Sequence, residues 1–310
     1  MPLWYASSHM SLFDIILVQP IFNVLVLIYG LLPGHDFGIS LIIFTVIVRL
    51  AMWPLVKKQL HQTKVMRELQ PELLRIKKQA KGNRQLEAQL MMELYKEKGV
   101  SPFGSIGLLL VQLPIFIALF AVVSQITQNA DNIAKYTYSF IEQLPAVQAA
   151  MHGDFNTTLF GVVDLTKHAV QPGSAGIYWP LFIMAIAAAV LQFIQSKQLM
   201  PQPKEKKRLR DMLKEQSSGK QVDQSEVSAA VTGKMIWLFP VLTFTVSIYL
   251  AGALVLYLLS QSTVAVIQQW LVLRKDQDEL QKVSEKTKNR AELAQEAKVV
   301  SKRSKKKRKK

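Results

Sequence analysis

Residues 38–56 read GISLIIFTVIVRLAMWPLV, an apolar stretch in which Arg49 is the single charged residue. As a helix these residues extend roughly 28 Å at about 1.5 Å per residue, close to the thickness of the hydrocarbon core of a bilayer. An arginine inside such a segment costs about 2.5–3.5 kcal/mol on insertion scales, which makes Arg49 a candidate functional residue. The alternative is snorkelling, because Arg49 lies about 10 Å of helix rise from the polar end near Lys57.

The composition is that of an integral membrane protein, with 50% hydrophobic residues and a net charge of +16 among 310 residues. Further runs without charge cover residues 99–130, 169–196 and 235–273. The last run would be about 58 Å long as a helix, so it is expected to hold two spans that turn near Ala251-Gly252-Ala253. The sequence therefore predicts an all-α membrane protein with five transmembrane helices.

The basic residues predict the orientation of these spans. Apart from Arg49, 11 Lys and Arg lie in residues 57–98, 2 in residues 135–167, 9 in residues 197–234 and 15 from residue 274 onward. Because basic segments stay cytoplasmic, this alternation predicts an outer N-terminus and a cytoplasmic C-terminus. No Lys or Arg precedes Arg49, which argues against a signal or transit peptide and favours a bacterial inner membrane. The chain has no cysteine, so disulfides, thiolate chemistry and a lipid-modified cysteine are excluded.

One segment is ambiguous. Residues 15–34 are uncharged and long enough to span, but they contain Gln19, Pro20 and Asn23. They form either a sixth span or a helix that lies in the outer interface, and the charge rule does not separate these two readings.

Between the first two spans lies a charged segment with helical periodicity. Its apolar residues recur at helical spacing on either side of a Gly-Asn turn at residues 82–83, which predicts an antiparallel helical hairpin. Pro71 is expected to kink or restart the first arm. The apolar positions of the two arms are Val65, Leu69, Leu73 and Ile76, then Leu86, Leu90 and Leu94.

The remaining loops differ in character. In the outer loop, residues 159–165 (LFGVVDL) are apolar enough to lie on the membrane surface. Residues 201–233 read as a charged inner linker that is partly disordered. The chain ends in SKRSKKKRKK, a block of like charges that stays extended.

Several kinds of chemistry lack the residues they need. The five spans contain no Asp or Glu. An intramembrane aspartyl protease or a carboxylate proton relay needs such a residue, so the sequence argues against both. The five histidines are scattered without metal-ligand spacing, and no G-x-x-x-x-G-K-[ST] phosphate loop exists. We therefore expect a protein that is not an enzyme and binds no cofactor.

The spans instead carry neutral polar side chains at membrane depth. Thr45 and Arg49 are four residues apart and share a helix face. Others lie on the later spans, including Gln112, Gln195 and the cluster at residues 260–263. Each polar group either bonds a neighbouring helix or contributes to a wet cavity. Since the spans supply no carboxylate, the expected counter-charge for Arg49 is water, lipid phosphate or a visiting acid.

These residues also carry a resemblance to a known family. The runs TVIVRLAMWPL (residues 45–55), LQP (69–71), LYKEKGVSPFG (94–104) and LLVQLPIFIAL (109–119) resemble the YidC family of membrane protein insertases. FIQ (193–195), LVLY (254–257) and IQQ (267–269) extend the resemblance, which covers residues 11–274.

The resemblance implies a five-helix core with a polar groove that opens to the cytoplasm and the lipid but is closed outside. In that groove Arg49 would face acidic segments of an incoming chain, and Thr45, Gln112, Gln195 and Tyr257 match groove positions. It also implies the cytoplasmic hairpin and favours the interfacial reading of residues 15–34. Where the family often has Pro-Ser-Gly between the last two spans this chain has Ala251-Gly252-Ala253, so the turn is expected to depend on Gly252.

The predicted function is therefore that of a membrane protein insertase and chaperone for inner-membrane proteins. The alternative is a small-anion transporter or channel with Arg49 as its anion site, and a structural scaffold is a third option. Expected partners are nascent membrane proteins, the ribosome or anionic lipid at the basic tail, and membrane lipids, with a Sec translocon left open.

These expectations divide the chain into nine segments. They are the outer N-terminus with the interfacial helix (1–36), the first span (37–57), the cytoplasmic helical hairpin (58–99), the second span (100–128), the outer loop (129–175), the third span (176–197), the cytoplasmic linker (198–233), the fourth and fifth spans (234–273) and the basic cytoplasmic tail (274–310).

Overall fold

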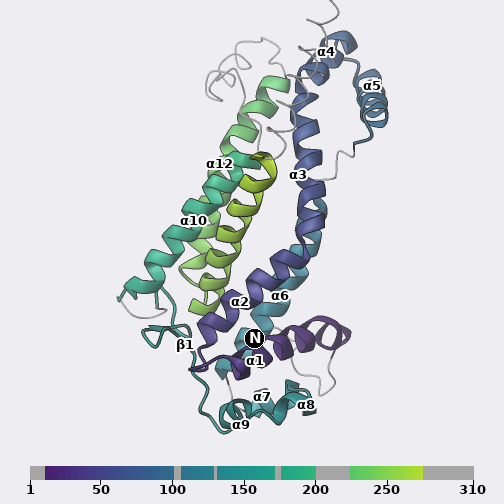
Figure 1. The fold of residues 1–310 in the computed structure, drawn as a ribbon. Helices are drawn as coiled ribbons and strands as arrows, with labels where there is room; N and C mark the ends of the chain where they lie inside the picture. The colour runs from purple at the N-terminus through teal and green to yellow at the C-terminus, as the bar shows by residue number, and fades with distance from the viewer. Residues whose placement is uncertain (1–10, 101–105, 129–130, 172–175, 200–223, 275–310) are drawn as a thin grey trace, which may run out of the picture. The chain divides into compact units, whose positions relative to one another are not determined.

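The structure is a computed structural model that describes residues 11–100, 106–128, 131–171, 176–199 and 224–274, and these residues are almost entirely helical (Figure 1). The predicted disordered linker and the basic tail after Arg274 lie outside the described residues, apart from the ends of the linker. The elements are η2 (Asp14–Val18), α1 (Gln19–Leu31), α2 (Phe37–Ala51), α3 (Trp53–Glu68), α4 (Gln70–Ala80), α5 (Arg84–Glu97), α6 (Ile106–Gln128), α7 (Asp131–Tyr136), α8 (Ser139–Glu142), α9 (Pro145–Met151), β1 (Thr158–Leu159), β2 (Val163–Asp164), α10 (Trp179–Leu199), α12 (Gln224–Ser247) and the last helix (Gly252–Arg274).

The chain divides into two compact units, residues 1–266 and residues 267–310. The first unit holds every element up to the first four turns of the last helix. The described part of the second unit is the remainder of that helix, where the Arg274 guanidinium lies 5.2 Å from the centroid of the Trp270 ring.

The segment around Arg49 is a bent helix pair. We expected one helix through Val56, but α2 ends at Ala51 and α3 begins at Trp53, with a bend of 60°. The bend follows from Pro54, which has no N–H to donate to the carbonyl of Leu50 and therefore interrupts the ladder of backbone hydrogen bonds.

Three described helices are long and apolar enough to cross a membrane, and the bent pair adds a fourth if it forms one span. They are Asp14–Leu31, Trp179–Gln198 and Gly252–Arg274, and the bent pair is Phe37–Ala51 with Trp53–Met66. The apolar segments Val111–Ile126 and Ile236–Ser247 are shorter. A multi-pass helical membrane protein follows from these helices, with the two-residue antiparallel strands β1 and β2 as an exception to the all-α prediction.

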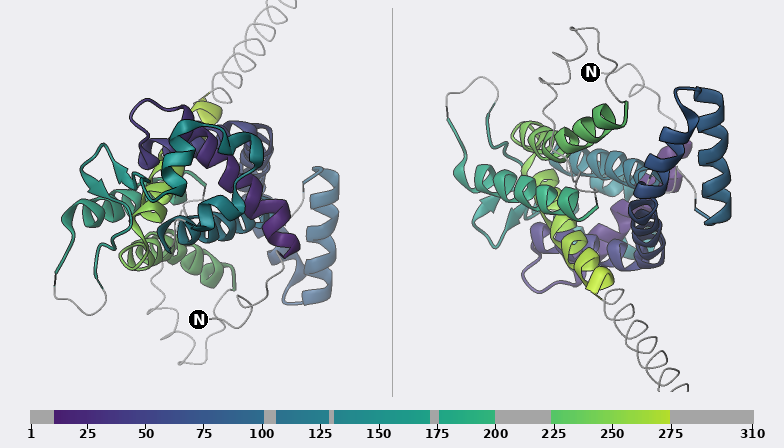
Figure 2. Two further views of the ribbon diagram at one scale, coloured as in Figure 1. Left: turned by 90° about the horizontal axis from the view of Figure 1, so that it is seen from below. Right: turned by 90° about the horizontal axis from the view of Figure 1, so that it is seen from above.

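Large apolar side chains are exposed along these helices, as expected where lipid replaces water. Examples are Ile183 and Val190 on α10 and Val241 and Leu242 on α12. These two helices lie side by side (Figures 1 and 2), joined by edge-to-face packing of Phe182 with Phe244, whose ring centroids are 5.7 Å apart.

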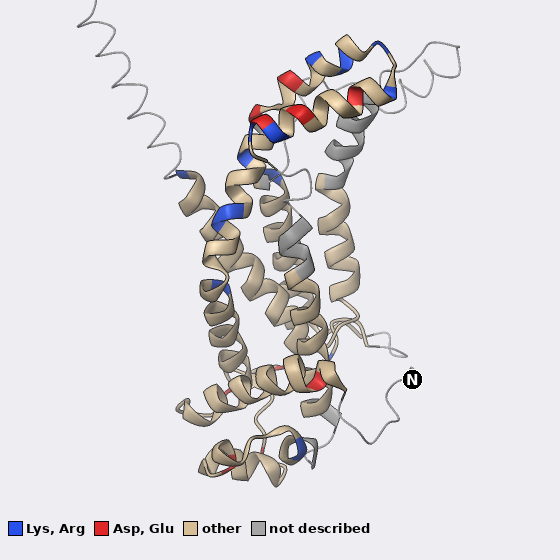
Figure 3. Ribbon diagram, turned by 90° about the vertical axis from the view of Figure 1, so that its right-hand side faces the viewer, with Lys and Arg blue, Asp and Glu red and all other residues tan. Residues whose placement is uncertain are grey.

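Charged residues are concentrated on α4 and α5, which follow the C-terminal end of α3 (Figure 3). Leu69 and Leu94 are buried there, whereas Leu86 is exposed. The turn between the two helices uses left-handed backbone at Lys81 and Gly82, after which the Asn83 side chain accepts hydrogen bonds from the first turn of α5. The helix break predicted at Pro71 falls at Leu69, with Pro71 in the first turn of α4.

Candidate functional site

Arg49 lies in the last turn of α2, where the guanidinium is favoured by the negative end of the helix dipole. Only 6% of the residue is exposed, although it carries a full charge. Four residues earlier, Thr45 is also buried, and its hydroxyl donates a hydrogen bond of 2.7 Å to the carbonyl of Leu41. The same helix face therefore offers a satisfied hydroxyl and, one turn on, a buried cation.

Tyr257 on the last helix faces this cation. It is 2% exposed, and its hydroxyl lies within electrostatic range of the Arg49 guanidinium. The phenol ring packs toward Phe116 on α6, with ring centroids 6.3 Å apart. A phenol oxygen accepts hydrogen bonds and orients its dipole toward a cation, so Tyr257 keeps Arg49 in a polar surrounding among apolar helices.

Gln112 links the tyrosine to a third helix. Its amide nitrogen donates to the Tyr257 hydroxyl at 2.7 Å and to the side-chain oxygen of Gln261 at 3.1 Å. The structure thus brings three predicted residues, Arg49, Gln112 and Tyr257, into one cluster built from α2, α6 and the last helix. We call Arg49, Gln112, Tyr257 and Gln261 the polar cluster.

Gln195 on α10 contacts the same helix slightly further along. It is buried, and its amide nitrogen donates a 3.0 Å hydrogen bond to the backbone carbonyl of Ser262. That carbonyl belongs to a residue in mid-helix, so the bond fixes α10 against the last helix. Among the predicted site residues, Gln195 therefore contacts the backbone beside the polar cluster, not the side chains within it.

Sequence reasoning placed Gln261 in a polar run but not in the site. The signal that identifies it is its separation of four residues from Tyr257, which puts both side chains on one helix face. Any residue that bonds Tyr257 from another helix will then meet Gln261 as well. The helices that build the cluster contain no Asp or Glu, so the positive charge of Arg49 dominates its electrostatics. In low dielectric such a charge attracts a carboxylate more strongly than it does in water.

At the far end of α2 the outer loop is bonded to α1 and to the start of α2. Asn23 of α1 donates to the carbonyl of Tyr136 and accepts from the backbone N–H of Tyr138, at 2.8 and 2.6 Å. The Asp36 carboxylate accepts from the N–H of Ile39 and from the N–H of Phe160 in the loop. Asn23, which left the reading of residues 15–34 open, is therefore satisfied by loop backbone.

The same loop also completes the start of the last helix. The backbone N–H groups of Gly252 and Ala253 donate to the carbonyls of Lys167 and Leu165, at 2.8 and 2.9 Å. The first N–H groups of a helix have no partner within it, so these carbonyls replace a side-chain cap. Residues 131–170, which we call the outer cap after the location that the distribution of Lys and Arg predicts for them, thus bond to this end of the helices.

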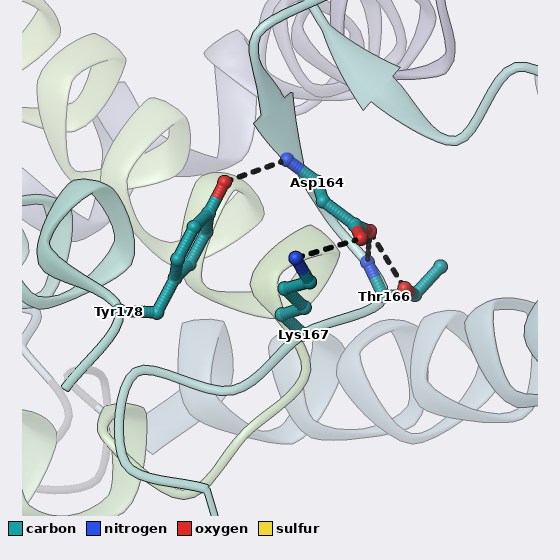
Figure 4. Close-up of polar contacts among 4 residues, drawn as sticks. All are labelled: Asp164, Thr166, Lys167 and Tyr178. Atoms are coloured by element: carbon teal, nitrogen blue, oxygen red, sulfur yellow. Dashed lines mark hydrogen bonds and ion pairs between the residues drawn. The ribbon is translucent and has the colours of Figure 1, made fainter. Parts of the chain in front are cut away.

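Polar contacts of Asp164 with Thr166, Lys167 and Tyr178 stabilise this part of the outer cap (Figure 4). Asp164 accepts from the hydroxyl and N–H of Thr166, its carboxylate lies 3.7 Å from the Lys167 ammonium, and its N–H donates to the hydroxyl of Tyr178. Burial alone would raise the pKa of the Asp164 carboxyl, but the hydrogen bonds from Thr166 and the charge of Lys167 together lower it below its ordinary value.

Within the described residues, no group of three or more His, Cys, Asp or Glu is arranged to hold a metal ion. The polar cluster itself offers one buried cation, Arg49, and neutral hydrogen-bonding groups.

Comparison with known proteins finds one matching family and several similar proteins. The model of the family described as 60Kd inner membrane protein matches residues 28–280. A membrane protein insertase YidC of Fusobacterium nucleatum subsp. nucleatum is 28% identical over 240 residues, which are 77% of this chain and 87% of that protein.

Two longer relatives carry the same description. The protein of Ectopseudomonas mendocina is 28% identical over 259 residues, which are 84% of this chain and 34% of the relative. The protein of Tolumonas auensis is 43% identical over 104 residues, which are 34% of this chain and 19% of the relative. The chain therefore matches about a third or less of the length of these two relatives.

Proposed function

Because the chain belongs to the YidC family of membrane protein insertases, the 60Kd inner membrane protein family, we propose that it inserts membrane proteins into the inner membrane and assists their folding. The observation that carries the proposal is the burial of Arg49 beside Tyr257 and the neutral amides of the polar cluster. A site of this kind attracts an acidic segment of a client chain by charge, and the contact has to stay weak for the client to be released.

The proposed site lies in a polar groove that opens to the cytoplasm and to lipid. Arg49 receives a carboxylate of the client's polar tail, and Thr45, Gln112, Gln195 and Tyr257 supply neutral hydrogen-bonding groups. This contact lowers the desolvation cost of bringing the tail into the bilayer. The apolar segment of the client then moves along α6 and α12 into lipid, driven by burial at about 25 cal/mol per Å².

The proposed topology has five spans, at residues 37–57, 100–128, 176–197 and, as a pair, 234–273. The N-terminus is outside, and the cytoplasmic side carries the α4–α5 hairpin at residues 58–99, the linker and the tail. The distribution of Lys and Arg supports this orientation. In it, α1 lies in the outer interface, since its buried face packs on the outer cap and on α2 and α6.

The outer cap explains why such a groove would open to one side only. Its backbone carbonyls are engaged by the last helix, and its N–H groups by Asn23 and Asp36. A path to the outer side would have to break these hydrogen bonds. A small-anion transporter needs access from both sides, so the cap favours the insertase.

The proposed partners follow from charge. The tail at residues 274–310 carries 15 Lys and Arg and binds ribosomal RNA or anionic lipid through phosphate groups. Clients are nascent membrane proteins, with or without a Sec translocon.

Reconstitution of the purified protein alone in liposomes tests the proposal. A short single-span client with an acidic outer tail should become protected from added protease, and protein-free liposomes provide the control. Efflux of a trapped anion is measured in parallel. Client protection without anion efflux supports the insertase, whereas anion efflux without client protection would establish a transporter instead.

A further inference from the structure

The turn between β1 and β2 presents two apolar side chains to the surroundings of the protein. Phe160 is 70% exposed and Val162 is 76% exposed, although both belong to the well-bonded outer cap. The strands pair in the register Thr158↔Asp164 and Leu159↔Val163, and the N–H of Val162 closes the turn on the carbonyl of Leu159 at 3.1 Å. The exposed pair is thus held on a defined hairpin.

The backbone at this turn is unfavourable for an aromatic residue. Phe160 has a φ of 55° and Gly161 a φ of 67°, so the two central residues of the 159–162 turn have the positive φ values of a type I′ turn, for which Asn-Gly is the usual pair. A phenylalanine there is maintained by its surroundings, since its N–H donates to the Asp36 carboxylate. Residues held in an unfavourable backbone conformation often lie at functional positions, so we infer that the Phe160 side chain has a function.

The base of the hairpin is fixed against two membrane helices. Leu159 is buried against Gly38 in the first turn of α2, where an added Cβ would lie 2.7 Å from the leucine side chain. The N–H of Asp164 in β2 donates to the hydroxyl of Tyr178, the residue before α10. The tip therefore lies beside the first residues of α2 and α10, and a bilayer interface is expected at such ends of membrane-crossing helices.

Aromatic side chains at the same level are also exposed. Trp179 opens α10 and is 62% exposed, and Tyr249 follows α12 and is exposed as well. Tryptophan and tyrosine are typical of the membrane–water interface. The hairpin tip continues this belt, because residues 158–163 carry no charge and the one carboxylate of β2 is turned toward Thr166 and Lys167.

We propose that the β1–β2 turn is a lipid anchor, which inserts Phe160 and Val162 into the leaflet around the starts of α2 and α10. The occupant of this apolar surface is the boundary between head groups and acyl chains, in continuity with the lipid-facing sides of the helices. The anchor holds the outer cap against the membrane, independently of what the polar cluster binds.

The absence of cysteine makes the depth of the tip measurable. In the full-length protein, Val162→Cys is labelled with a bimane fluorophore and reconstituted in nanodiscs of phosphatidylcholine and phosphatidylglycerol. The matched control is His152→Cys, an exposed polar position at the end of α9. Lipids with a nitroxide near the head group should quench the probe at residue 162 severalfold more than the probe at residue 152, and aqueous iodide should show the reverse order.

A second variant separates anchoring from turn stability. Phe160→Asn in the Val162→Cys background places the residue that this turn prefers, so the hairpin should stay folded while the aromatic contact is lost. The probe should then become accessible to iodide with no fall in thermal stability. Equal iodide quenching at residues 162 and 152 in the parent proteins, or no quenching by lipid nitroxide at residue 162, would overturn the proposal.

Discussion

The side-chain amide of Gln112 donates a 2.7 Å hydrogen bond to the hydroxyl of Tyr257, and this bond joins α6 to the last helix beside the buried Arg49. The second amide hydrogen of Gln112 points to Gln261, so both donors of one side chain serve the last helix. These bonds hold the neutral members of the polar cluster in place beside the cation, and we expect its members to act as a unit.

Substitution of Tyr257 by phenylalanine should expose this coupling. Tyr257→Phe removes one acceptor from Gln112, a loss of about 0.5–1.5 kcal/mol for a neutral hydrogen bond. We expect a severalfold fall in client insertion. In a double-mutant cycle with Gln112→Leu, the two effects should not add, because both variants remove the same bond. Additive effects would show that the two side chains act separately.

Arg49 is predicted to act by charge. Arg49→Ala should abolish insertion of clients with acidic outer tails and leave the protein folded, since removing a buried charge among apolar helices does not destabilise them. Arg49→Lys should retain part of the activity, because a point charge remains although the guanidinium fork is lost. Protease protection of the client in liposomes measures both. A client whose tail acids are neutralised serves as the control and should depend less on Arg49.

Gly252 is predicted to be required for packing. It does not have positive φ, but a Cβ there would lie 2.8 Å from the Leu181 side chain and 3.0 Å from the Cα of Leu165. Gly252→Ala should therefore destabilise the protein by about 1–3 kcal/mol, the usual cost of overpacking. Thermal unfolding in detergent measures this loss. Val246→Ile, which adds a methyl group to an exposed α12 side chain, should leave the unfolding temperature unchanged.

Acid should weaken the outer cap through Asp164. The folded state lowers the pKa of this carboxyl, so its contribution to stability is complete above the ordinary aspartate pKa of about 4 and is lost as the pH falls through the folded value. Asp164→Asn keeps an acceptor for Thr166 but loses the charge. The variant should unfold at a lower temperature than the parent at pH 7, and the gap should close in acid. A gap that persists at pH 2 would contradict this assignment.

The basic tail is predicted to bind through phosphate groups. Deletion of the residues after Lys298 should weaken co-sedimentation with ribosomes, and the loss should be greatest at low salt, where counterion release is most favourable. Insertion of short clients after their synthesis should survive the deletion. Unchanged sedimentation at low salt would assign the tail to anionic lipid instead.

Features that depend on the local sequence could be predicted here, whereas contacts between segments far apart in the chain could not. Arg49 and Gln112 could be chosen from the sequence because polar residues in apolar helices are conspicuous, whereas Tyr257 was chosen only through the resemblance to a family. The break at Met52 was missed, since the effect of Pro54 on a helix depends on what supports the bend. Gly252 was identified as necessary for its backbone freedom, but the structure shows that the reason is the proximity of Leu165 and Leu181.

The outer cap could not be predicted in this way. Its bonds pair loop carbonyls with helix N–H groups from distant parts of the chain, and backbone groups carry no sequence signal. Asn23 illustrates the difficulty, because in the outer cap it bonds the main-chain carbonyl of Tyr136 and the main-chain N–H of Tyr138, and almost any residue could supply these groups. Side chains that bond across the membrane helices were mostly found, with Gln261 as an exception, whereas the backbone groups that bind the outer cap were not.

The hydrogen bonds from Gly252 and Ala253 to Lys167 and Leu165 impose an order on the biogenesis of this protein. A ribosome releases the loop long before it releases the last helix. Until then, the carbonyls of Lys167 and Leu165 lack the N–H groups that they bind in the complete protein. Arrival of the final helix is then the closing event of assembly. A chain that stalls before residue 252 lacks these two donors, so the carbonyls of Lys167 and Leu165 are without the partners that they have in the complete protein.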